Sequence, residues 1–320
     1  MTGTRTRPVI LFVLGMGRSG TSALTRVLSL CGAALPSKMM GANDSNPRGF
    51  WEPRESLLLN RSILDRHRSA WWDPTLRLTE EESYVGKERA ECMAKIESFV
   101  AKLPESDVIV IKDLQIVVLY DMWFEAVRAA GYDIAVVIPV RHPEEVASSL
   151  AAAVKGASPE LTSALWLKGN LLSERHTRDL PRVVVDYPNM LEDWRREVKR
   201  VSTALSVDLT PPDENAVDEF LAPSLRRQRN DKPVIDRFGT DWLSTVYEVL
   251  RAAGRDEPID TDTLDRVYEQ FRAAEHDFRL AYDGNRHFQD GLLNKVFKPL
   301  LMKPLLDIAA LTHRGKGTWA

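Results

Sequence analysis

A glycine-rich stretch near the N-terminus carries the residue types of an anion-binding loop. Gly15 to Ser22 reads GMGRSGTS and has the spacing of the phosphate loop G-x-x-x-x-G-K-[ST], but Thr21 stands where that loop has lysine. The glycines allow several backbone N–H groups to converge on one anion, and a following helix would add its positive end. Thr21 and Ser22 supply hydroxyl donors, and the planar fork of Arg18 can grip two oxygens of a phosphate or sulfate. We therefore expect an anion site that lacks the lysine of ATP- and GTP-binding loops.

A second group of such residues lies in VRHPEEVASSL, at 140–150. Arg141 closes an apolar run, Pro143 stands where proline suits the first turn of a helix, and Ser149 follows Arg141 by eight residues. An arginine before a helix with a hydroxyl on that helix predicts a second anion site on another strand of the same sheet.

The elements that must position these residues follow from hydrophobic patterning. Continuous apolar runs predict strands at 9–14, 108–113, 133–141 and 181–187. Periodic apolar residues predict helices at 24–31, 55–68, 80–103, 116–130, 143–154, 241–253 and 261–282. Apolar runs that alternate with helices favour a parallel sheet covered on both faces. The sequence thus predicts an α/β fold, P-loop-like, with three layers and a helical C-terminal extension.

The two motifs resemble those of sulfotransferases that use 3′-phosphoadenosine 5′-phosphosulfate (PAPS), and most of all the bacterial branch with an RSGTS loop. In that family the R-S/K-G-T-[ST] loop grips the 5′-phosphosulfate, and an arginine with a serine eight residues later grips the 3′-phosphate. Further resemblance lies in NPRGFWEPRE at 46–55, IKD at 111–113, LWLKGNLLSERHTRDLPRVVVDY at 165–187 and LAPSLRRQR at 221–229, so that it covers roughly residues 8 to 230. The resemblance implies that the donor is bound by Gly17, Arg18, Ser19, Gly20, Thr21, Ser22, Arg141 and Ser149.

The resemblance also implies a chemistry that needs no metal. A sulfuryl group carries less charge than a terminal phosphoryl group, which explains the missing lysine. Arg18 would stabilise charge on the departing phosphate, and Lys112, at the end of the second strand, would meet the sulfuryl oxygens. Glu52 is expected to take the proton of the acceptor hydroxyl, with Glu55 in reserve. The acceptor would be a small molecule, a glycan or a lipid, and adenosine 3′,5′-bisphosphate the second product.

Two other functions fit parts of the pattern. A Mg²⁺-dependent nucleotide kinase or NTPase with a deviant loop would use Asp113 or Asp186 as a metal ligand, whereas a non-catalytic nucleotide-binding or interaction protein would show no turnover. The segment KDLQ, at 112–115, also departs from relatives, which more often have proline after the aspartate.

Several further residues have both a functional and a structural interpretation. Arg227 lies in a basic run that relatives use to close over the nucleotide, although a solvated basic surface explains it equally well. Trp71, Trp72 and Trp166 would line an acceptor pocket or belong to the core.

Composition sets the outer limits. The chain has 320 residues, 44% hydrophobic and 28% charged, with a net charge of −3, so it has no global field for nucleic acid. Two cysteines without metal-ligand spacing fit a cytosolic protein, and no apolar run is long enough to span a membrane. We expect a PAPS-binding domain over residues 1–230 and a helical extension over 231–320 that packs on it or contacts the acceptor or the inner face of the membrane.

Overall fold

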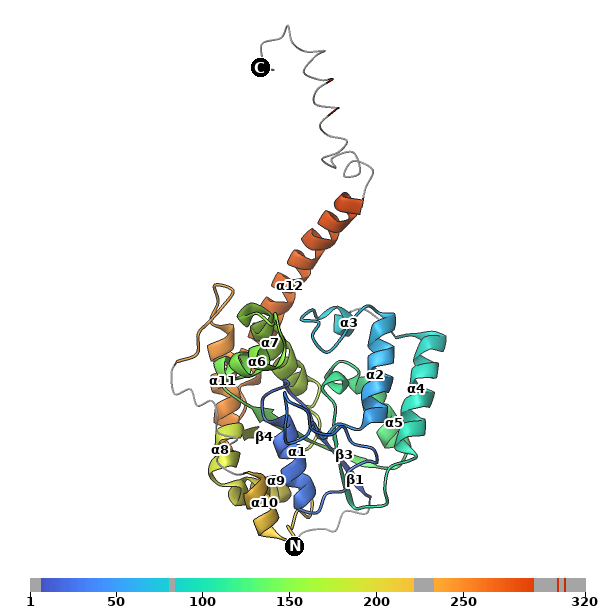
Figure 1. Ribbon diagram of the computed structural model, residues 1–320, viewed down its shortest axis with the longest axis vertical. Coiled ribbons are helices and arrows are strands. Elements are labelled where there is room, and N and C mark those ends of the chain that lie inside the picture. The colour runs from blue at the N-terminus through green and yellow to red at the C-terminus, as the bar shows by residue number, and fades with distance from the viewer. Residues whose placement is uncertain (1–6, 81–83, 222–232, 291–303, 305–307, 309–320) are drawn as a thin grey trace. The chain divides into compact units, whose positions relative to one another are not determined.

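A computed structural model describes residues 7–80, 84–221, 233–290, 304 and 308 (Figure 1). The described residues up to Tyr268 form one compact unit, and those from Glu269 onward form a second. The division of function between residues 1–230 and 231–320, and the role of the extension, stay predictions.

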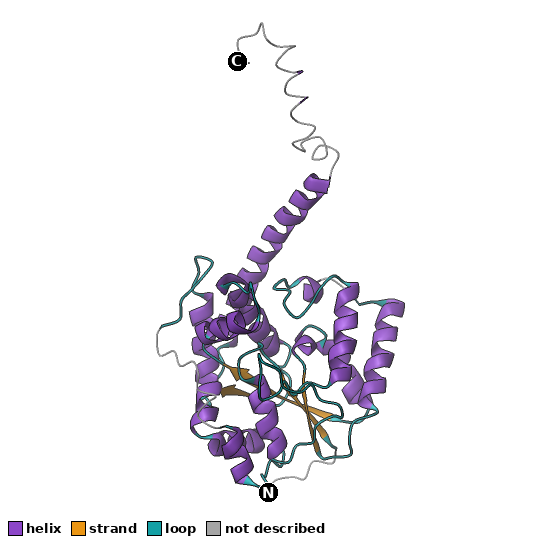
Figure 2. Cartoon of the chain, viewed as in Figure 1, coloured by secondary structure: helices purple, strands orange, loops and turns teal. Residues whose placement is uncertain are grey.

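A parallel four-stranded sheet forms the centre of the first unit (Figure 2). Its strands are β1 (Val9–Val13), β2 (Val108–Lys112), β3 (Asp133–Val140) and β4 (Arg182–Asp186), in the order β2-β1-β3-β4. Every residue of β1 and β2 is buried, as expected for parallel strands covered on both faces. The predicted α/β fold with a central parallel sheet is confirmed, and all four predicted strands are present.

Helices flank both faces of the sheet in the described part of the chain (Figures 1 and 2). They are α1 (Thr21–Leu30), α2 (Arg54–Arg66), α3 (Arg77–Glu80), α4 (Gly86–Val100), the 3₁₀ helix η1 (Leu114–Val117), α5 (Tyr120–Ala129), α6 (Pro143–Ala153), α7 (Pro159–Arg175), α8 (Tyr187–Glu192), α9 (Trp194–Leu205), α10 (Glu214–Phe220), α11 (Trp242–Ala253) and α12 (Thr261–Asp290). Helices α1, α8, α9 and α10 share one apolar core with the sheet. On the other face Phe12 of β1 packs against Trp123 and Phe124 of α5, and Phe99 of α4 packs on Trp123.

Two predicted elements differ in the structure. The helix predicted over 116–130 is divided into η1 and α5, because the Asp113 carboxylate accepts the backbone N–H of Gln115 and turns the chain immediately after β2. The helix predicted over 80–103 begins only at Gly86, after the short α3. Helices α7 and α9, which carry much of the core, had no sequence prediction.

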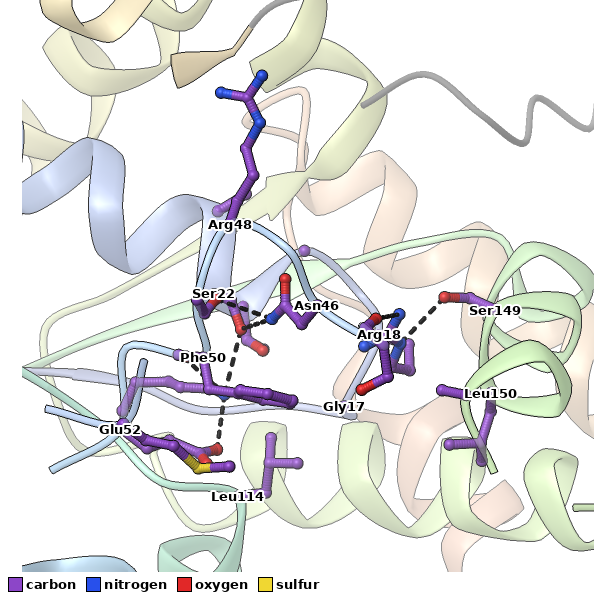
Figure 3. A pocket seen from close by; sticks show the side chains of 18 of the residues that line it. Gly17, Arg18, Ser22, Asn46, Arg48, Phe50, Glu52, Leu114, Ser149 and Leu150 are labelled. Carbon is purple, nitrogen blue, oxygen red and sulfur yellow. Dashed lines mark hydrogen bonds and ion pairs between the residues drawn. The ribbon is translucent and has the colours of Figure 1, made fainter. Parts of the chain in front are cut away.

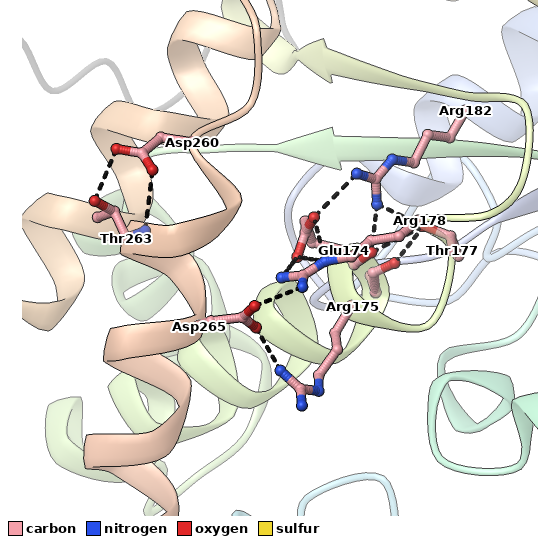
Figure 4. Close-up of polar contacts among 9 residues, drawn as sticks. Glu174, Arg175, Thr177, Arg178, Arg182, Asp260, Thr263 and Asp265 are labelled. Atoms are coloured by element: carbon pink, nitrogen blue, oxygen red, sulfur yellow. Dashed lines mark hydrogen bonds and ion pairs between the residues drawn. The ribbon is translucent and has the colours of Figure 1, made fainter.

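An ion-pair network attaches the start of α12 to α7 (Figure 4). Glu174, fully buried on α7, accepts hydrogen bonds from Nε and Nη2 of Arg178 and pairs with Arg182 at 3.0 Å. Arg178 also pairs with Asp265 of α12 at 2.7 Å, and Arg175 pairs with the same carboxylate. These arginines lie in the segment 165–187 of the sequence resemblance, where their partners give them a structural role.

Candidate functional site

The glycine-rich loop runs from β1 into α1 at the carboxyl edge of the sheet. Gly20 precedes α1 with φ +90°, and a Cβ there would lie 2.1 Å from the Tyr187 ring, so that only glycine fits. Arg18 also has positive φ, +68°, a conformation that non-glycine residues rarely adopt and that is common at functional sites. The first turn of α1 carries no acidic side chain, so its N–H groups face an environment that suits an anion.

A cavity of about 710 Å³ opens at this loop, a size typical of small-molecule sites (Figure 3). The predicted residues that line it are Gly17, Arg18, Gly20, Thr21, Ser22, Glu52, Lys112, Arg141 and Ser149. Ser19 is buried within the loop and does not line the cavity, and its Oγ has no hydrogen-bond partner in the part of the chain that the structure describes. Arg227 lies outside the described residues.

Arg18 joins the two predicted anion motifs. Its Nε donates to Ser149 Oγ at 3.0 Å, and its Nη2 donates to the carbonyl oxygen of Ser45 at 3.1 Å (Figure 3). Arg141 Nη1 donates to the Arg18 carbonyl oxygen at 3.3 Å. Residues 131 positions apart in sequence thus meet at one end of the cavity. Burial, followed by the charge of Arg141, lowers the pKa of Arg18, so a bound anion would relieve the repulsion between the two guanidinium groups.

Arg141 is itself held in place by the protein. Its Nε pairs with Glu145, four residues later on α6, at 2.6 Å, and its guanidinium lies 4.9 Å from the centre of the Tyr187 ring. Trp166, fully buried, donates its indole N–H to the Arg141 carbonyl oxygen at 3.0 Å. Arg141 is therefore a rigidly oriented cation at the cavity wall.

Lys112 and Glu52 form a buried ion pair at the other end of the cavity. Lys112 Nζ lies 2.6 Å from Glu52 Oε1, and their side chains are only 3% and 7% exposed. Lys112 also donates to the Phe50 carbonyl oxygen at 3.3 Å and to Ser22 Oγ at 3.4 Å. The lysine thus connects the predicted base to the loop. Glu55, by contrast, is exposed and pairs with Lys102 at the surface without lining the cavity.

Asp113 has its acceptor sites filled by the protein. One carboxylate oxygen accepts from Ser56 and Asn60, and the other from the backbone and side-chain N–H groups of Gln115. Burial, with the charge of Glu52, raises the pKa of Asp113 to about 6. These bonds account for the KDLQ segment: the aspartate caps η1 and joins α2 to β2.

Asp186, at the end of β4, has fewer partners. It is buried, its Oδ1 has no hydrogen-bond partner among the described residues, and its Oδ2 lies 3.7 Å from Arg251 Nε. It is not among the residues that line the cavity. Within the described residues, no group of three or more His, Cys, Asp and Glu side chains is arranged to hold a metal ion.

The state of Asp186 makes stability depend on pH. Burial raises its pKa from 3.8 to about 6, so the folded protein binds the proton more tightly than the unfolded chain does. The free energy of unfolding should therefore fall as pH rises from about 4 to about 6, at roughly 1.4 kcal/mol for each tenfold difference in proton affinity. Asp186→Asn should remove up to about 3 kcal/mol of this fall. Urea unfolding at pH 4 and pH 7 measures it, and equal falls in both proteins would contradict the assignment.

The tryptophans that the sequence singled out have different surroundings. Trp71 lines the cavity and packs edge-on against Trp72, which is exposed beneath the guanidinium of Arg61. Trp166 belongs to the core.

Sequence reasoning missed other residues of the site. Tyr187, which lies against Gly20 and beneath Arg141, follows β4 directly, and its place at the carboxyl edge of the sheet was a usable signal. Asn46 Nδ2 donates to the Gly49 carbonyl oxygen at 2.8 Å and lies 3.5 Å from Ser22 Oγ.

The similarity of this chain to known proteins is limited. No family model matches the chain, and no curated protein matches it significantly. Among solved structures, it is similar to a sulfotransferase domain from the Synechococcus PCC 7002 olefin synthase, at 17% identity and a TM-score of 0.40, over 85% of this chain and 97% of that domain. A similarity of this degree establishes neither fold nor function. No helix among the described residues is both long and apolar enough to cross a membrane.

Proposed function

We propose that this protein is a PAPS-dependent sulfotransferase that moves a sulfuryl group to a hydroxyl of its acceptor. The observation that carries the proposal is the contact of Arg18 with Ser149 and Arg141, which unites two anion-binding motifs in one cavity whose far end holds Lys112 and Glu52 (Figure 3). A donor that carries anionic groups on both the 3′ and the 5′ oxygen of its ribose calls for two such anion sites.

The residues present fit such a donor. The loop offers an arginine, two hydroxyls and the N-terminus of α1, and Ser19 Oγ, buried in the loop, has no partner among the described residues. Arg141 and Ser149 line the same cavity and would take the 3′-phosphate, while Gly17, Arg18, Gly20, Thr21 and Ser22 would take the 5′-phosphosulfate.

In the proposed transfer, Glu52, Arg18 and Lys112 each have a separate role. Glu52 accepts the proton of the acceptor hydroxyl while the oxygen of that hydroxyl forms a bond to the sulfur of PAPS. The bond from sulfur to the bridging oxygen breaks, and its electron pair leaves with the 5′-phosphate of adenosine 3′,5′-bisphosphate. Arg18 stabilises this growing charge, and Lys112 contacts the sulfuryl oxygens. The protein supplies the cations, and no metal is assigned a role.

Transfer of radiolabelled sulfate from PAPS tests the proposal, with EDTA present throughout. We expect incorporation into an acceptor extract that EDTA leaves unchanged. Hydrolysis of ATP or phosphoryl transfer from it that EDTA abolishes would instead identify the Mg²⁺-dependent kinase or NTPase. Binding of adenosine 3′,5′-bisphosphate without turnover on any extract would identify the non-catalytic alternative.

Neighbouring serines on α6 provide a matched test of the 3′-phosphate site. Ser149 lines the cavity and accepts from Arg18, whereas Ser148 is exposed and donates to the Glu144 carbonyl oxygen. Ser149→Ala should weaken binding of adenosine 3′,5′-bisphosphate about tenfold, since a hydrogen bond to a charged group contributes about 1.5 kcal/mol or more. Ser148→Ala should leave calorimetric affinity unchanged. Equal affinities of the two variants would contradict a role of Ser149 in binding the 3′-phosphate.

A further inference from the structure

We infer that the acceptor is a small phenol or alcohol with an apolar body, whose single reacting hydroxyl meets Glu52. This rests on the proposed sulfotransferase function and goes beyond it, because neither the motifs nor the comparisons name an acceptor class. The inference comes from what lines the end of the cavity around the Lys112–Glu52 pair.

Apolar side chains dominate that end. Figure 3 shows Phe50 and Leu114 there, Met40 donates its backbone N–H to the Glu52 carbonyl oxygen, and the Leu57 carbonyl oxygen accepts from Gln115. Together with Trp71 these residues, Met40, Phe50, Leu57 and Leu114, are apolar residues of the cavity wall. Each is only partly buried, so each retains apolar surface that a ligand can cover. Covering apolar surface contributes about 25 cal/mol per Å². Lining of this kind, with a few convergent polar groups, is typical of sites for apolar small molecules.

The polar groups at this end are already engaged within the protein. Lys112 donates to Glu52 at 2.6 Å and over longer distances, 3.3 and 3.4 Å, to the Phe50 carbonyl oxygen and Ser22 Oγ. In the proposed transfer the longer bonds open for the sulfuryl oxygens, so Lys112 leaves no donor for hydroxyls of the acceptor. The acceptors of Asp113 are filled, and Gln115 Nε2 donates to that carboxylate and to the Leu57 carbonyl oxygen.

Glu52 is the exception, because a carboxylate has about four acceptor positions, whereas among the described side chains only Lys112 donates to it, at Oε1. It can therefore accept the hydrogen of one hydroxyl. A sugar would have to bury several hydroxyls here without partners, and each unpaired hydroxyl would weaken its binding.

The apolar end of the cavity adjoins the glycine-rich loop. A Cβ on Gly17 would lie 2.8 Å from Leu114 Cδ1, so the Leu114 side chain packs directly on the loop backbone. Figure 3 places Phe50, Glu52 and Leu114 at one end of the cavity and Ser149 and Leu150 at the other.

The nearby Arg48 does not add charge to the apolar end. Its side chain extends away from Glu52 in Figure 3, and its guanidinium donates to the carbonyl oxygens of Glu219 and Phe220. The acceptor end therefore has apolar side chains around Glu52, and its other charged groups, Lys112 and Asp113, are bonded within the protein.

Two adjacent leucines of α2 give a matched test. Leu57 lines the apolar end, whereas Leu58 is 68% exposed and does not line the cavity. Sulfate transfer from PAPS is measured with para-propylphenol and with methyl glucoside, in the wild type, Leu57→Gln, Leu58→Gln and the volume-conserving Leu57→Met. We expect kcat/KM for the phenol to exceed that for the glucoside at least tenfold. Leu57→Gln should raise KM for the phenol roughly tenfold, with KM for PAPS unchanged, since a mismatched pocket contact costs about 10–200-fold. Leu58→Gln should behave as the wild type, whereas Leu57→Met, which keeps an apolar side chain of similar volume, should raise KM for the phenol much less than Leu57→Gln does.

Two separate titrations keep the inference distinct from the proposed function. Failure of adenosine 3′,5′-bisphosphate to bind would overturn the sulfotransferase. Calorimetric binding of para-propylphenol needs no donor, and we expect it in the wild type and about tenfold weaker in Leu57→Gln. If the bisphosphate binds but the glucoside is the better acceptor, or if Leu57→Gln and Leu58→Gln bind the phenol equally well, the inference alone is overturned.

Discussion

Arg18→Ala is expected to lower kcat for sulfuryl transfer by about 10²- to 10³-fold, because it removes the donor aimed at charge that grows in the transition state. The backbone of Arg18 is already held with φ +68°, and its side chain is oriented by Ser149 and by the Ser45 carbonyl oxygen. A preoriented guanidinium needs little rearrangement during the reaction. The loss should therefore fall on kcat more than on KM for the acceptor.

Two further variants separate charge from geometry. Arg18→Lys keeps a cation but loses the fork that reaches two groups at once, so its kcat should lie between those of the wild type and Arg18→Ala. Arg54→Ala is the matched control, because Arg54 is exposed, contacts the Lys38 carbonyl oxygen and does not line the cavity. Steady-state kinetics at saturating PAPS measures all three. A kcat of Arg18→Ala within about threefold of the control would exclude Arg18 from the chemical step.

Lys112→Met is expected to lower the free energy of unfolding by about 3–5 kcal/mol, because it leaves the buried carboxylate of Glu52 without its partner. The chain contains a matched surface pair: Lys102 and Glu55 are also 2.6 Å apart, but 59% and 47% exposed. Lys102→Met should cost at most about 1 kcal/mol, since water already solvates the remaining charge. Urea unfolding of the two variants compares a buried and an exposed ion pair that have the same residue types and the same N–O distance.

The double variant Lys112→Met with Glu52→Gln isolates the cause. Removing both charges should restore much of the stability that Lys112→Met loses, because a neutral amide is left in place of an unpaired carboxylate. If the double variant is less stable than Lys112→Met by the full effect of Glu52→Gln, the two residues act independently. In that case the ion pair does not organise this end of the cavity.

The elements that carry the site were predictable because their signals are local. Continuous apolar runs marked the four strands, and the carboxyl ends of parallel strands must meet at one edge of the sheet. Arg18, Lys112 and Arg141 were therefore expected together, and the structure places all three around one cavity. The pairing of Arg141 with Glu145 is also local, since Arg141 lies just before α6 and Glu145 in its first turn.

Contacts between distant segments could not be predicted in this way. The partner of Lys112 is Glu52, 60 residues earlier, and no local pattern indicates that pairing. The role of Asp113 depends on hydrogen bonds from Ser56 and Asn60 of α2. More than 50 residues, which include α3 and α4, separate these two side chains from Asp113 in the sequence. The fit of Tyr187 against Gly20 likewise arises only when β4 is placed next to β3. These contacts between distant segments give Asp113 its structural role, which is to join α2 to the end of β2.

The most direct test of sulfotransferase function is a calorimetric titration of the wild type and of Arg141→Ala with adenosine 3′,5′-bisphosphate and, separately, with ATP plus Mg²⁺. We predict micromolar binding of the bisphosphate, at least tenfold weaker binding in Arg141→Ala, and little heat with ATP plus Mg²⁺. Tighter binding of ATP plus Mg²⁺ than of the bisphosphate would contradict the proposed function.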